Sequence, residues 1–365
     1  MDCWQNYGLR DGHGESCMKI GLVEYLNYVN KDGKPIGHGK KVLSEAGKMF
    51  EADEVRMICS DAYRSDFMKE AKRCEVKLPE ISQKETGIKL NEAVFRNIIK
   101  AFSVAEKEEI LWFTNTEWRL FAILPFVAKN KKVVVTCYRD VISDICNSNA
   151  RLKQLKLHLV KRGVERADLI VVTNQHLSLS DNQIFVPDYM YTEFYKKYDT
   201  IKKENRVLCV GAMRESKDLR GVVKLFSNSD IPVYIVGGFS DKQEYSWLAT
   251  HKTENITIED RIVPYDEYYR LIAESKYVII PYKMEAYDMA TSGILQETMF
   301  LKSIPIAPRK LLEFNGISGI GYNNLSEIPI NMDTLNQQAK KVKFDMHEYE
   351  EQNIKNKIAA AFEQL

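Results

Sequence analysis

The chain has 365 residues, with 52 lysines and arginines against 51 aspartates and glutamates and a formal charge of +1. Its hydrophobic fraction of 45% and charged fraction of 28% are those of a folded globular protein, which excludes a disordered chain, a collagen and a small disulfide scaffold. At about 150 residues per domain, this length predicts two domains. The balanced charge also argues against a dedicated nucleic-acid-binding protein, so we expect no nucleic-acid partner.

Cysteine usage and the first residues of the chain indicate a cytoplasmic protein. None of the seven cysteines forms a C-x-x-C pair, so we predict neither a zinc ribbon nor a redox dithiol and expect reduced, mostly buried thiols. No apolar segment follows Met1, so we expect no signal peptide. Residues 110–128 are apolar but carry Glu117 and Arg119 near their centre. We predict a strand and a buried helix there rather than a membrane span.

Short apolar runs alternate with longer amphipathic segments along the chain. The runs that we predict as strands are 55–59, 110–114, 132–137, 169–172, 206–211, 233–237, 277–281 and 304–307. The segments that we predict as helices are 16–29, 39–50, 93–105, 151–165, 219–228 and 265–275. Strands that are apolar throughout are typical of sheets covered on both faces, and their alternation with helices predicts parallel sheets.

This pattern is interrupted once, by the polar and charged residues 191–205. A new strand begins at Arg206, so we predict a boundary between two Rossmann-like domains, 1–198 and 199–345. We expect residues 346–365 to form an amphipathic helix that packs back towards the first domain. The predicted fold class is α/β, with two parallel-sheet domains that face each other across a cleft.

A basic loop follows the predicted strand 206–211. Arg214 and Lys217 lie in this loop, shortly after Gly211. In doubly wound sheets, ligands bind beyond the carboxyl ends of the strands, and two cations suit a diphosphate. A solvated turn would give the same pattern.

Two further strand ends carry residues suited to a nucleotide. The strand 233–237 ends in Gly237 and Gly238, and glycine lets a backbone approach a ligand or turn sharply. Ile262 and Val263 follow the next apolar stretch and could hold a flat base ring through their backbone groups. A simple strand-to-helix turn is the alternative for the glycines.

The next predicted helix combines an anion site with a carboxylate. Thr291, Ser292 and Gly293 open this helix, which continues with Ile294, and the free N–H groups of a helix N-terminus bind anions. Glu297 follows one turn later, where its carboxylate can accept two hydrogen bonds from a ribose diol. Its apolar neighbours indicate a buried glutamate rather than an exposed one. Neither a Walker A nor a G-x-G-x-x-G pattern occurs.

These strings resemble the retaining glycosyltransferases of the GT-B fold, family 4 type, also called group 1 glycosyltransferases. The matching strings are Val210-Gly211 with Lys217, 235–237, 262–265, 281–297 and 304–307, with 165–174 and 186–189 upstream. The resemblance covers most of residues 130–325. It implies a UDP- or GDP-sugar donor bound by the C-terminal domain and an acceptor bound by the N-terminal domain. It also implies that neither a cofactor nor a metal ion takes part.

The chain departs from the family at its Glu-x7-Glu pair. Glu285 lies at the usual distance after the preceding strand, but Glu297 comes four residues later than expected, which puts Met289 at the first glutamate position. Either the loop has lengthened and Glu285 still contacts the donor, or backbone groups of Ser292 and Gly293 replace it. We favour the second interpretation.

Residues 8–16 form a glycine-rich segment that resembles the family's first glycine loop. Gly14 would then bring backbone N–H groups to the donor phosphate. His13 is a candidate to contact phosphate or acceptor, with a neutral loop residue as the alternative. The family has a strand before this loop. Since only seven residues precede Gly8, we expect that strand to be missing or much shortened.

Asp140 follows the predicted strand 132–137. We predict that it orients the acceptor hydroxyl, although an N-cap or salt-bridge role fits equally well. No side chain is a convincing nucleophile, and the resemblance favours a front-side reaction in which the leaving diphosphate helps to take the acceptor proton. Positioning and stabilisation of phosphate charge would then carry catalysis.

The segment 151–166 holds six lysines and arginines against one glutamate. Leu152, Leu155, Leu159 and Val160 share one stripe of the helix predicted there. One interpretation is a core-packed helix with a basic outer face. The other is a face that meets an anionic membrane, where a lipid-linked acceptor would lie.

We therefore predict a cytoplasmic glycosyltransferase, peripheral on the inner face of the membrane. It would move a sugar with retention to a glycan or lipid-linked acceptor, as in surface polysaccharide biosynthesis. The alternatives are a nucleotide-sugar epimerase on the same fold and a catalytically silent GT-B subunit.

Overall fold

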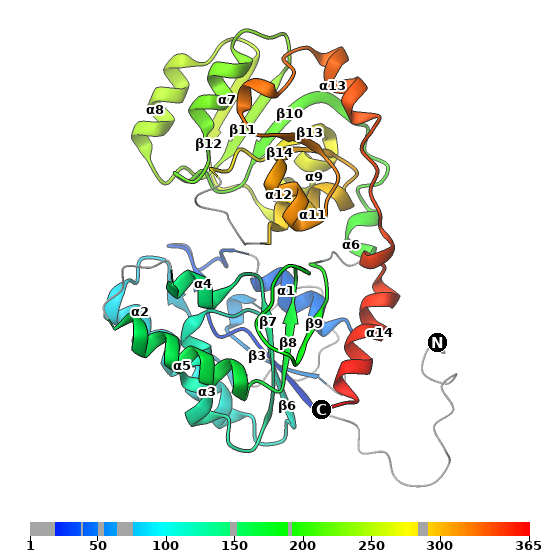
Figure 1. Cartoon of the computed structure of the whole chain (residues 1–365). Coiled ribbons are helices and arrows are strands. Elements are labelled where there is room, and N and C mark those ends of the chain that lie inside the picture. Colours follow the sequence, from blue (N-terminus) through cyan, green and yellow to red (C-terminus); the bar gives the residue numbers. More distant parts are fainter. Residues whose placement is uncertain are drawn as a thin grey trace. The chain divides into compact units, whose positions relative to one another are not determined.

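The computed structural model describes residues 19–37, 39–49, 55–63, 76–146, 152–188, 192–283 and 291–365 (Figure 1). Contacts within the chain separate two compact units, Met1–Thr114 with Val127–Val133, and Asn115–Phe126 with Val134–Leu365. The described strands form two large parallel sheets and one small pair, β2 (Tyr28–Val29) with β5 (Ile81–Ser82). The predicted α/β class with two Rossmann-like parallel sheets is confirmed.

The first large sheet has seven strands in the order β4-β3-β1-β6-β7-β8-β9. These strands are β1 (Ile20–Val23), β3 (Val55–Cys59), β4 (Val76–Lys77), β6 (Ile110–Phe113), β7 (Lys132–Cys137), β8 (Leu169–Val172) and β9 (Gln183–Phe185). The pairings of β1 with β3 and β6, of β3 with β4, and of β8 with β7 and β9 are all parallel. Strands β3, β7 and β8 have the predicted bounds. Each was predicted from a continuous apolar run, and such a run is typical of a strand that is buried on both faces of a sheet.

The predicted helix 16–29 is wrong, because the chain forms strand β1 within it. All four residues of β1 are buried, and the strand pairs on both sides, with β3 and with β6. Periodicity alone cannot assign such a short apolar run to a helix or a strand. Gly21 favours the strand, because a Cβ atom at this position would lie only 2.7 Å from Leu111 Cδ2 on β6. The first sheet thus contains a strand that follows residues 8–16 in the sequence. Residues 1–7, where we expect the family's first strand to be missing or much shortened, lie outside the described residues.

Strand β1 also changes which residues form the first glycine loop. Residues 8–16 precede β1 in the sequence, whereas the loop between β1 and α1 (Gly39–Gly47) contains Gly37 in the left-handed region, with φ of +77°. His13 and Gly14 lie outside the described residues. The argument for choosing them, a glycine loop after the first strand, applies to Gly37 and Gly39 instead.

The helices of this half are α2 (Gly87–Val104), α3 (Trp118–Val127), α4 (Val141–Cys146) and α5 (Lys153–Arg166). The apolar stretch 110–128 forms β6 and α3, as predicted. Helix α5 approaches α3 closely, because a Cβ atom on Gly163 would lie 1.8 Å from Phe121 O. Within the described ranges, no helix combines the length and hydropathy that a membrane-spanning helix needs.

The second large sheet has six strands in the order β12-β11-β10-β13-β14-β15. They are β10 (Glu204–Val210), β11 (Val233–Gly237), β12 (Ile256–Asp260), β13 (Ser275–Ile279), β14 (Ile304–Pro308) and β15 (Ile320–Tyr322). In chain order this is the 3-2-1-4-5-6 arrangement of a dinucleotide-binding Rossmann domain. The strand order reverses between β10 and β13, so a ligand is expected at the carboxyl ends of these two strands.

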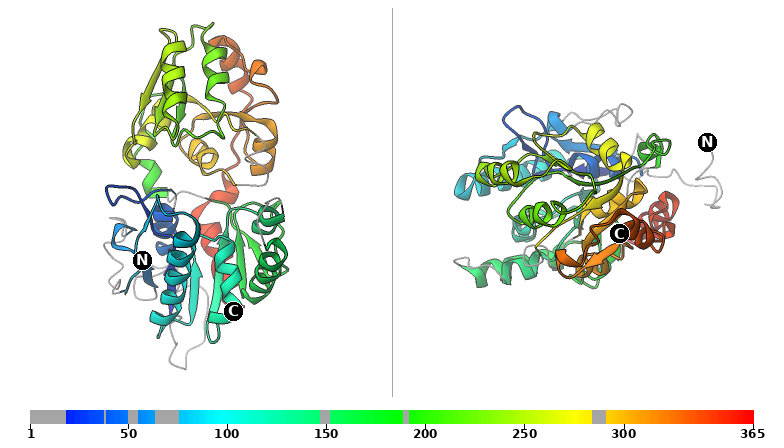
Figure 2. Two further views of the ribbon diagram at one scale, coloured as in Figure 1. Left: turned by 90° about the vertical axis from the view of Figure 1, so that its left-hand side faces the viewer. Right: turned by 90° about the horizontal axis from the view of Figure 1, so that it is seen from above.

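Helices cover both faces of the six-stranded sheet (Figures 1 and 2). Helices α7 (Leu219–Phe226) and α8 (Lys242–His251) follow β10 and β11 and lie on one face. The connection from β12 to β13 contains α9 (Tyr265–Glu274). The connections from β13 to β14 and from β14 to β15 contain α11 (Gly293–Phe300) and α12 (Arg309–Asn315), and these three helices lie on the opposite face. Right-handed crossovers that run in opposite directions along a sheet place their helices on opposite faces.

Helix α7 shows how the sequence dictates this packing. Leu219, Val222, Val223 and Phe226 are buried at helical spacing, and they pack into the apolar core of the sheet. The Asp218 side chain caps the helix by accepting a hydrogen bond from Gly221 N at 2.9 Å. The helix therefore begins immediately after the basic loop that follows β10.

The remaining helices are α6 (Thr192–Lys196), α13 (Met332–Ala339) and α14 (Glu351–Phe362). Helix α6 lies in the polar segment where we predicted the domain boundary. The amphipathic C-terminal helix is present as α14, with Ile354, Ile358, Ala361 and Phe362 buried. Lys357 Nζ lies 5.5 Å from the centre of the Phe185 ring on β9.

Candidate functional site

The loops after β10 and β13 lie side by side where the strand order reverses. Asp218 N donates to Pro281 O at 2.8 Å, and Lys283 N donates to Ser216 O at 2.8 Å. Lys217 and Tyr282 form an antiparallel bridge between the same two loops. The basic loop and the segment that leads to α11 are therefore joined at the carboxyl ends of the strands, where Rossmann domains bind ligands.

Two glycines allow β10 and β11 to approach each other at this edge. Gly211 has a φ of +98°, in the left-handed region. A Cβ atom on Gly237 would lie 1.7 Å from Gly211 O, so position 237 accepts no side chain. The close approach expected of these glycines is present, and it is an approach of the Gly237 backbone to the Gly211 backbone.

The two predicted cations differ in burial. Lys217 is only 7% exposed, and its Nζ donates to Val210 O at 3.1 Å. Burial lowers the pKa of Lys217, and the positive charge of Arg214 lowers it further. Arg214 is exposed. An anion bound here would offset the unfavourable burial of the Lys217 ammonium group. It would also offset the repulsion between the positive charges of Lys217 and Arg214.

The proposed base loop lies at the end of β12. Ile262 is 65% exposed and Val263 is partly buried. A Cβ atom on Gly238 would lie 3.9 Å from Ile262 Cγ1, so this loop borders the glycine end of β11. Arg261 fixes the loop through ion pairs with Glu259 and Glu267, both at 2.6 Å.

Glu297 is fully buried on α11, as its apolar neighbours predicted. Tyr268 Oη donates to Glu297 Oε2 at 2.6 Å, and Tyr269 Oη donates to Oε1 at 3.3 Å. Burial and the negative charge of Glu297 hold the pKa of Tyr268 well above its ordinary value. Sequence reasoning missed both tyrosines. The available signal was their position on the helix that follows Ile262 and Val263.

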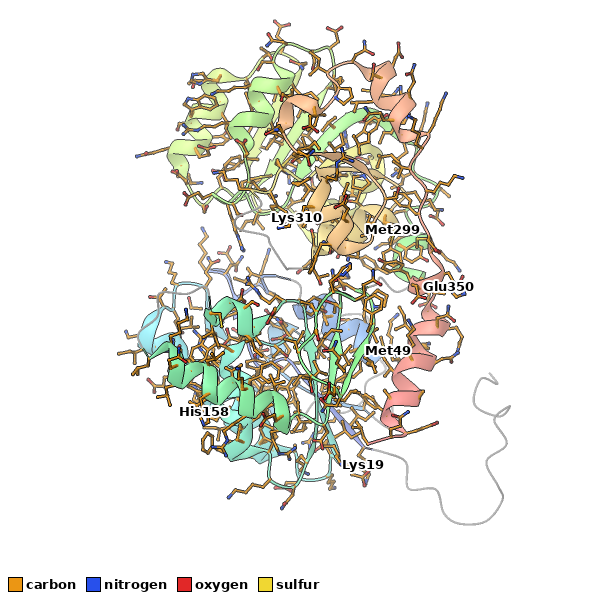
Figure 3. All side chains as sticks on the ribbon, viewed as in Figure 1. Lys19, Met49, His158, Met299, Lys310 and Glu350 are labelled. Carbon is orange, nitrogen blue, oxygen red and sulfur yellow. The ribbon has the colours of Figure 1, made fainter. Side chains whose placement is uncertain are left out.

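The N-terminus of α11 is held by its surroundings. Thr291 N donates to Tyr138 O at 2.9 Å, and the Thr291 and Thr173 hydroxyls lie 2.9 Å apart. Ser292 N donates to Asn315 Oδ1 at 2.9 Å. Ser292 is thus the N-cap residue of α11, and the helix itself begins at Gly293, followed by Ile294. In Figure 3, Met299 marks α11 and Lys310 marks α12.

Asp140 caps helix α4. Its Oδ1 accepts hydrogen bonds from Ile142 N at 2.9 Å and Ser143 N at 3.0 Å. Arg139 forms an ion pair with Asp144 at 2.7 Å. The N-cap alternative for Asp140 is thus present in the structure, and the role in orienting an acceptor stays a prediction.

Three points complete the description of the predicted site. Glu285 lies outside the described residues. Within the described part of the chain, no group of three histidine, cysteine, aspartate or glutamate side chains could hold a metal ion. Among the described cysteines, Cys59, Cys137 and Cys209 are buried free thiols, and Cys146 is an exposed one.

The solved structures that are similar to this chain have the GT-B fold. No family model and no curated protein sequence matches the chain. Among solved structures, Anabaena Alr3699/HepE in complex with UDP and glucose is similar, with a TM-score of 0.64 and 14% identity over 95% of this chain and all of that one.

Two other structures give the same result. AviGT4, a glycosyltransferase involved in Avilamycin A biosynthesis, has a TM-score of 0.60 and 10% identity over 95% of this chain and 97% of its own. The sucrose-phosphate synthase of Thermosynechococcus elongatus has a TM-score of 0.57 and 15% identity over 94% of this chain and 95% of its own. Similarity at this level of identity defines the fold.

Proposed function

We propose that this protein is a glycosyltransferase that uses a nucleotide-diphosphate sugar as donor. The observation that carries the proposal is the buried carboxylate of Glu297 on α11, the helix that starts at the same sheet edge as Gly211 and Lys217. A carboxyl group is fully buried only where it has specific hydrogen-bond partners. UDP is the first nucleotide to test, because similar structures hold UDP.

Each part of the donor has a matching group in this arrangement. The diphosphate would lie against Lys217, Arg214 and the N-terminus of α11, where cations and helix N–H groups stabilise negative charge. The ribose diol would bind Glu297. The base would stack over the backbone of Ile262 and Val263.

The reaction would proceed with retention and without a metal ion, as in family 4 enzymes. The bond from the anomeric carbon to the diphosphate breaks while the acceptor oxygen attacks the same face, and the leaving phosphate oxygen takes the acceptor proton. Lys217 and Arg214 would stabilise the charge that develops on the diphosphate. Asp140 would orient the acceptor, and Tyr138, two residues earlier, already contacts Thr291 of the proposed donor site. Glu285 would contribute a contact to the donor only if its loop has lengthened.

The variant Glu297→Gln tests the donor site. Calorimetry with UDP and GDP should show binding to the wild-type protein and about tenfold weaker binding to the variant, the loss of about one hydrogen bond to a charged group. Glu313→Gln, on the exposed surface of α12, is the matched control and should bind like the wild type. If neither nucleotide binds the wild-type protein, the catalytically silent subunit is the better explanation.

We also propose that α5 holds the protein against an anionic membrane, where a lipid-linked glycan acceptor for surface polysaccharide synthesis would lie. Leu152 is 71% exposed and Leu155 is 51% exposed, so the apolar stripe is only partly packed into the core. Val160 is buried, and basic side chains and His158 (Figure 3) lie on the exposed surface of the same helix. Each lysine or arginine near an anionic surface contributes about 1 kcal/mol to binding.

Sedimentation with vesicles tests this membrane proposal. Vesicles with 30% anionic lipid should retain the protein and neutral vesicles should not, and Leu152→Ser combined with Leu155→Ser should release it. The control Ile330→Ser removes an apolar side chain that is 42% exposed in the other half of the chain, and it should leave sedimentation unchanged. Binding that is independent of lipid charge would contradict the proposal.

A further inference from the structure

Glu297 is completely shielded from solvent, although it is the group proposed to bind ribose. Its exposed fraction is 0%, and both carboxylate oxygens accept hydrogen bonds from tyrosine hydroxyls. A ribose hydroxyl can reach this carboxylate only if one of the groups that cover it moves. The two tyrosines that bond to it are the groups to compare.

Tyr268 and Tyr269 differ in their freedom to move. Tyr269 is 2% exposed and packs edge-on against Phe194, with ring centres 4.8 Å apart. Tyr198 lies 6.3 Å from the same ring. Tyr268 is only partly buried. Tyr268 also packs edge-on against Tyr269, with ring centres 5.1 Å apart. Tyr269 has the further ring contacts and is buried, whereas Tyr268 is partly exposed, so Tyr268 is the tyrosine that we expect to move.

Tyr268 also lies where the three parts of the proposed nucleotide site meet. Its backbone N–H donates to Pro264 O at 2.8 Å, in the first turn after the base loop. A Cβ atom on Gly211 would lie 3.8 Å from Tyr268 Cε2, so the ring rests beside the glycine at the end of β10. Its hydroxyl makes the shorter of the two hydrogen bonds to Glu297, at 2.6 Å.

We propose that the Tyr268 hydroxyl occupies, in the nucleotide-free protein, the position on Glu297 that a ribose hydroxyl takes in the complex. Tyr268 thus competes with the ribose for Glu297, and this inference rests on the proposed donor site. The phenol gives the carboxylate one hydrogen bond, whereas a ribose diol gives two. A ribonucleotide therefore gains one hydrogen bond when it displaces Tyr268, and a 2′-deoxyribonucleotide replaces one bond by one and gains none.

The variant Tyr268→Phe tests the exchange directly, because it removes the competing hydroxyl and keeps the ring. Calorimetry should show about tenfold tighter binding of both UDP and 2′-deoxy-UDP, which corresponds to about 1.4 kcal/mol. The ratio of the two affinities should stay unchanged. Tyr269→Phe is the comparison variant and should tighten the binding of neither nucleotide, because the Tyr269 hydrogen bond to Glu297 is present with and without nucleotide.

Two results would overturn the inference. Weaker binding to Tyr268→Phe would mean that the hydroxyl positions Glu297 for the ligand, and unchanged binding would mean that it plays no part in the exchange. These results differ from failure of the proposed function. In that case the wild-type protein binds no nucleotide, or Glu297→Gln binds UDP as tightly as the wild type.

A spectroscopic measurement on the wild-type protein needs no variant that might fold poorly. Burial and, after it, contact with Glu297 raise the pKa of Tyr268 well above its ordinary value. Release of the hydroxyl towards solvent removes both causes, so one more tyrosine should ionise near its ordinary pKa of about 10. Saturation with UDP should therefore add one tyrosinate to the absorbance titration at 295 nm. An identical titration with and without UDP would contradict the exchange.

Discussion

The close approach of the chain at the ends of the paired strands β10 and β11 gives a sharp prediction for Gly237. In Gly237→Ala, the new Cβ atom would start 1.7 Å from Gly211 O, whereas ordinary van der Waals contacts of Cβ atoms begin at 3.4 Å. The two backbones must separate by about 1.7 Å to restore an ordinary contact. The obstacle is the backbone carbonyl of Gly211, the residue that directly follows β10, so it cannot turn aside as a flexible side chain would.

The expected loss of stability is large. Overpacking of a well-packed interior costs about 1–3 kcal/mol, and a backbone obstacle puts Gly237→Ala at or above the upper end of that range. For a domain of this size, a loss of about 3 kcal/mol corresponds to a fall in melting temperature of about 6–12 °C. The displaced Gly211 belongs to the proposed phosphate loop, so the affinity for UDP should fall as well.

Gly238→Ala is the matched control, one residue further along the same loop. Its Cβ atom would meet Ile262 Cγ1 at 3.9 Å, an ordinary contact, so the free energy of unfolding should change by less than about 0.5 kcal/mol. Calorimetric melting of the two variants and the wild type measures the difference. Equal melting temperatures for Gly237→Ala and Gly238→Ala would refute the argument from close approach.

Two further predictions concern buried lysines. Burial and neighbouring Lys302 lower the pKa of Lys203 to about 8 from 10.5. The unfolded chain therefore binds this proton more tightly, and the free energy of unfolding should rise between about pH 8 and pH 10. Urea midpoints at pH 7.5 and pH 9.5 should show the rise in the wild type and a smaller one in Lys203→Met; the same rise in both would contradict the assignment. Burial also lowers the pKa of Lys217, and a bound diphosphate would raise it, so UDP binding should take up protons where Lys217 is partly deprotonated. Calorimetry in two buffers of different ionisation enthalpy detects this uptake, which should be absent in Lys217→Met.

Four of the strands that could not be predicted share a position in the sheets. The strand predictions relied on continuous apolar runs, which are typical of strands buried on both faces. Strands β4, β9, β12 and β15 lie at the four ends of the strand orders of the two large sheets, so each pairs on one side only among the strands that the structure describes. In β12, buried and exposed residues alternate at the start of the strand, so an apolar-run criterion passes over it.

The first strand, β1, was missed for a different reason. It is fully buried and central, but it is only four residues long and contains Gly21. Its apolar residues also fit helical spacing together with Leu26 and Val29. Only the pairing with β3 and β6 distinguishes the two possibilities, and pairing depends on residues far along the chain.

Some residues of the candidate site could be predicted because they come directly after a predicted strand. The burial of Glu297 followed from its apolar neighbours. The hydrogen bonds to Tyr268 and Tyr269 did not, because they join α9 to α11 across one face of the sheet. The capping role of Asp140 was one of two open alternatives, since a carboxylate after a strand and before a helix suits both.

The order of the strands explains why no short motif marks this site. Because β10 and β13 are neighbours, the loops that follow them meet through the hydrogen bond from Asp218 N to Pro281 O. Helix α11, which follows the loop after β13, carries Glu297. The loop after β12 leads to α9, the helix that carries Tyr268. Each contribution comes from a different loop, so side chains can change one at a time while the sheet holds their positions. The exception is the close approach of Gly237 to the carbonyl oxygen of Gly211, where a Cβ atom on residue 237 would lie 1.7 Å from that oxygen and no side chain at this position keeps the geometry.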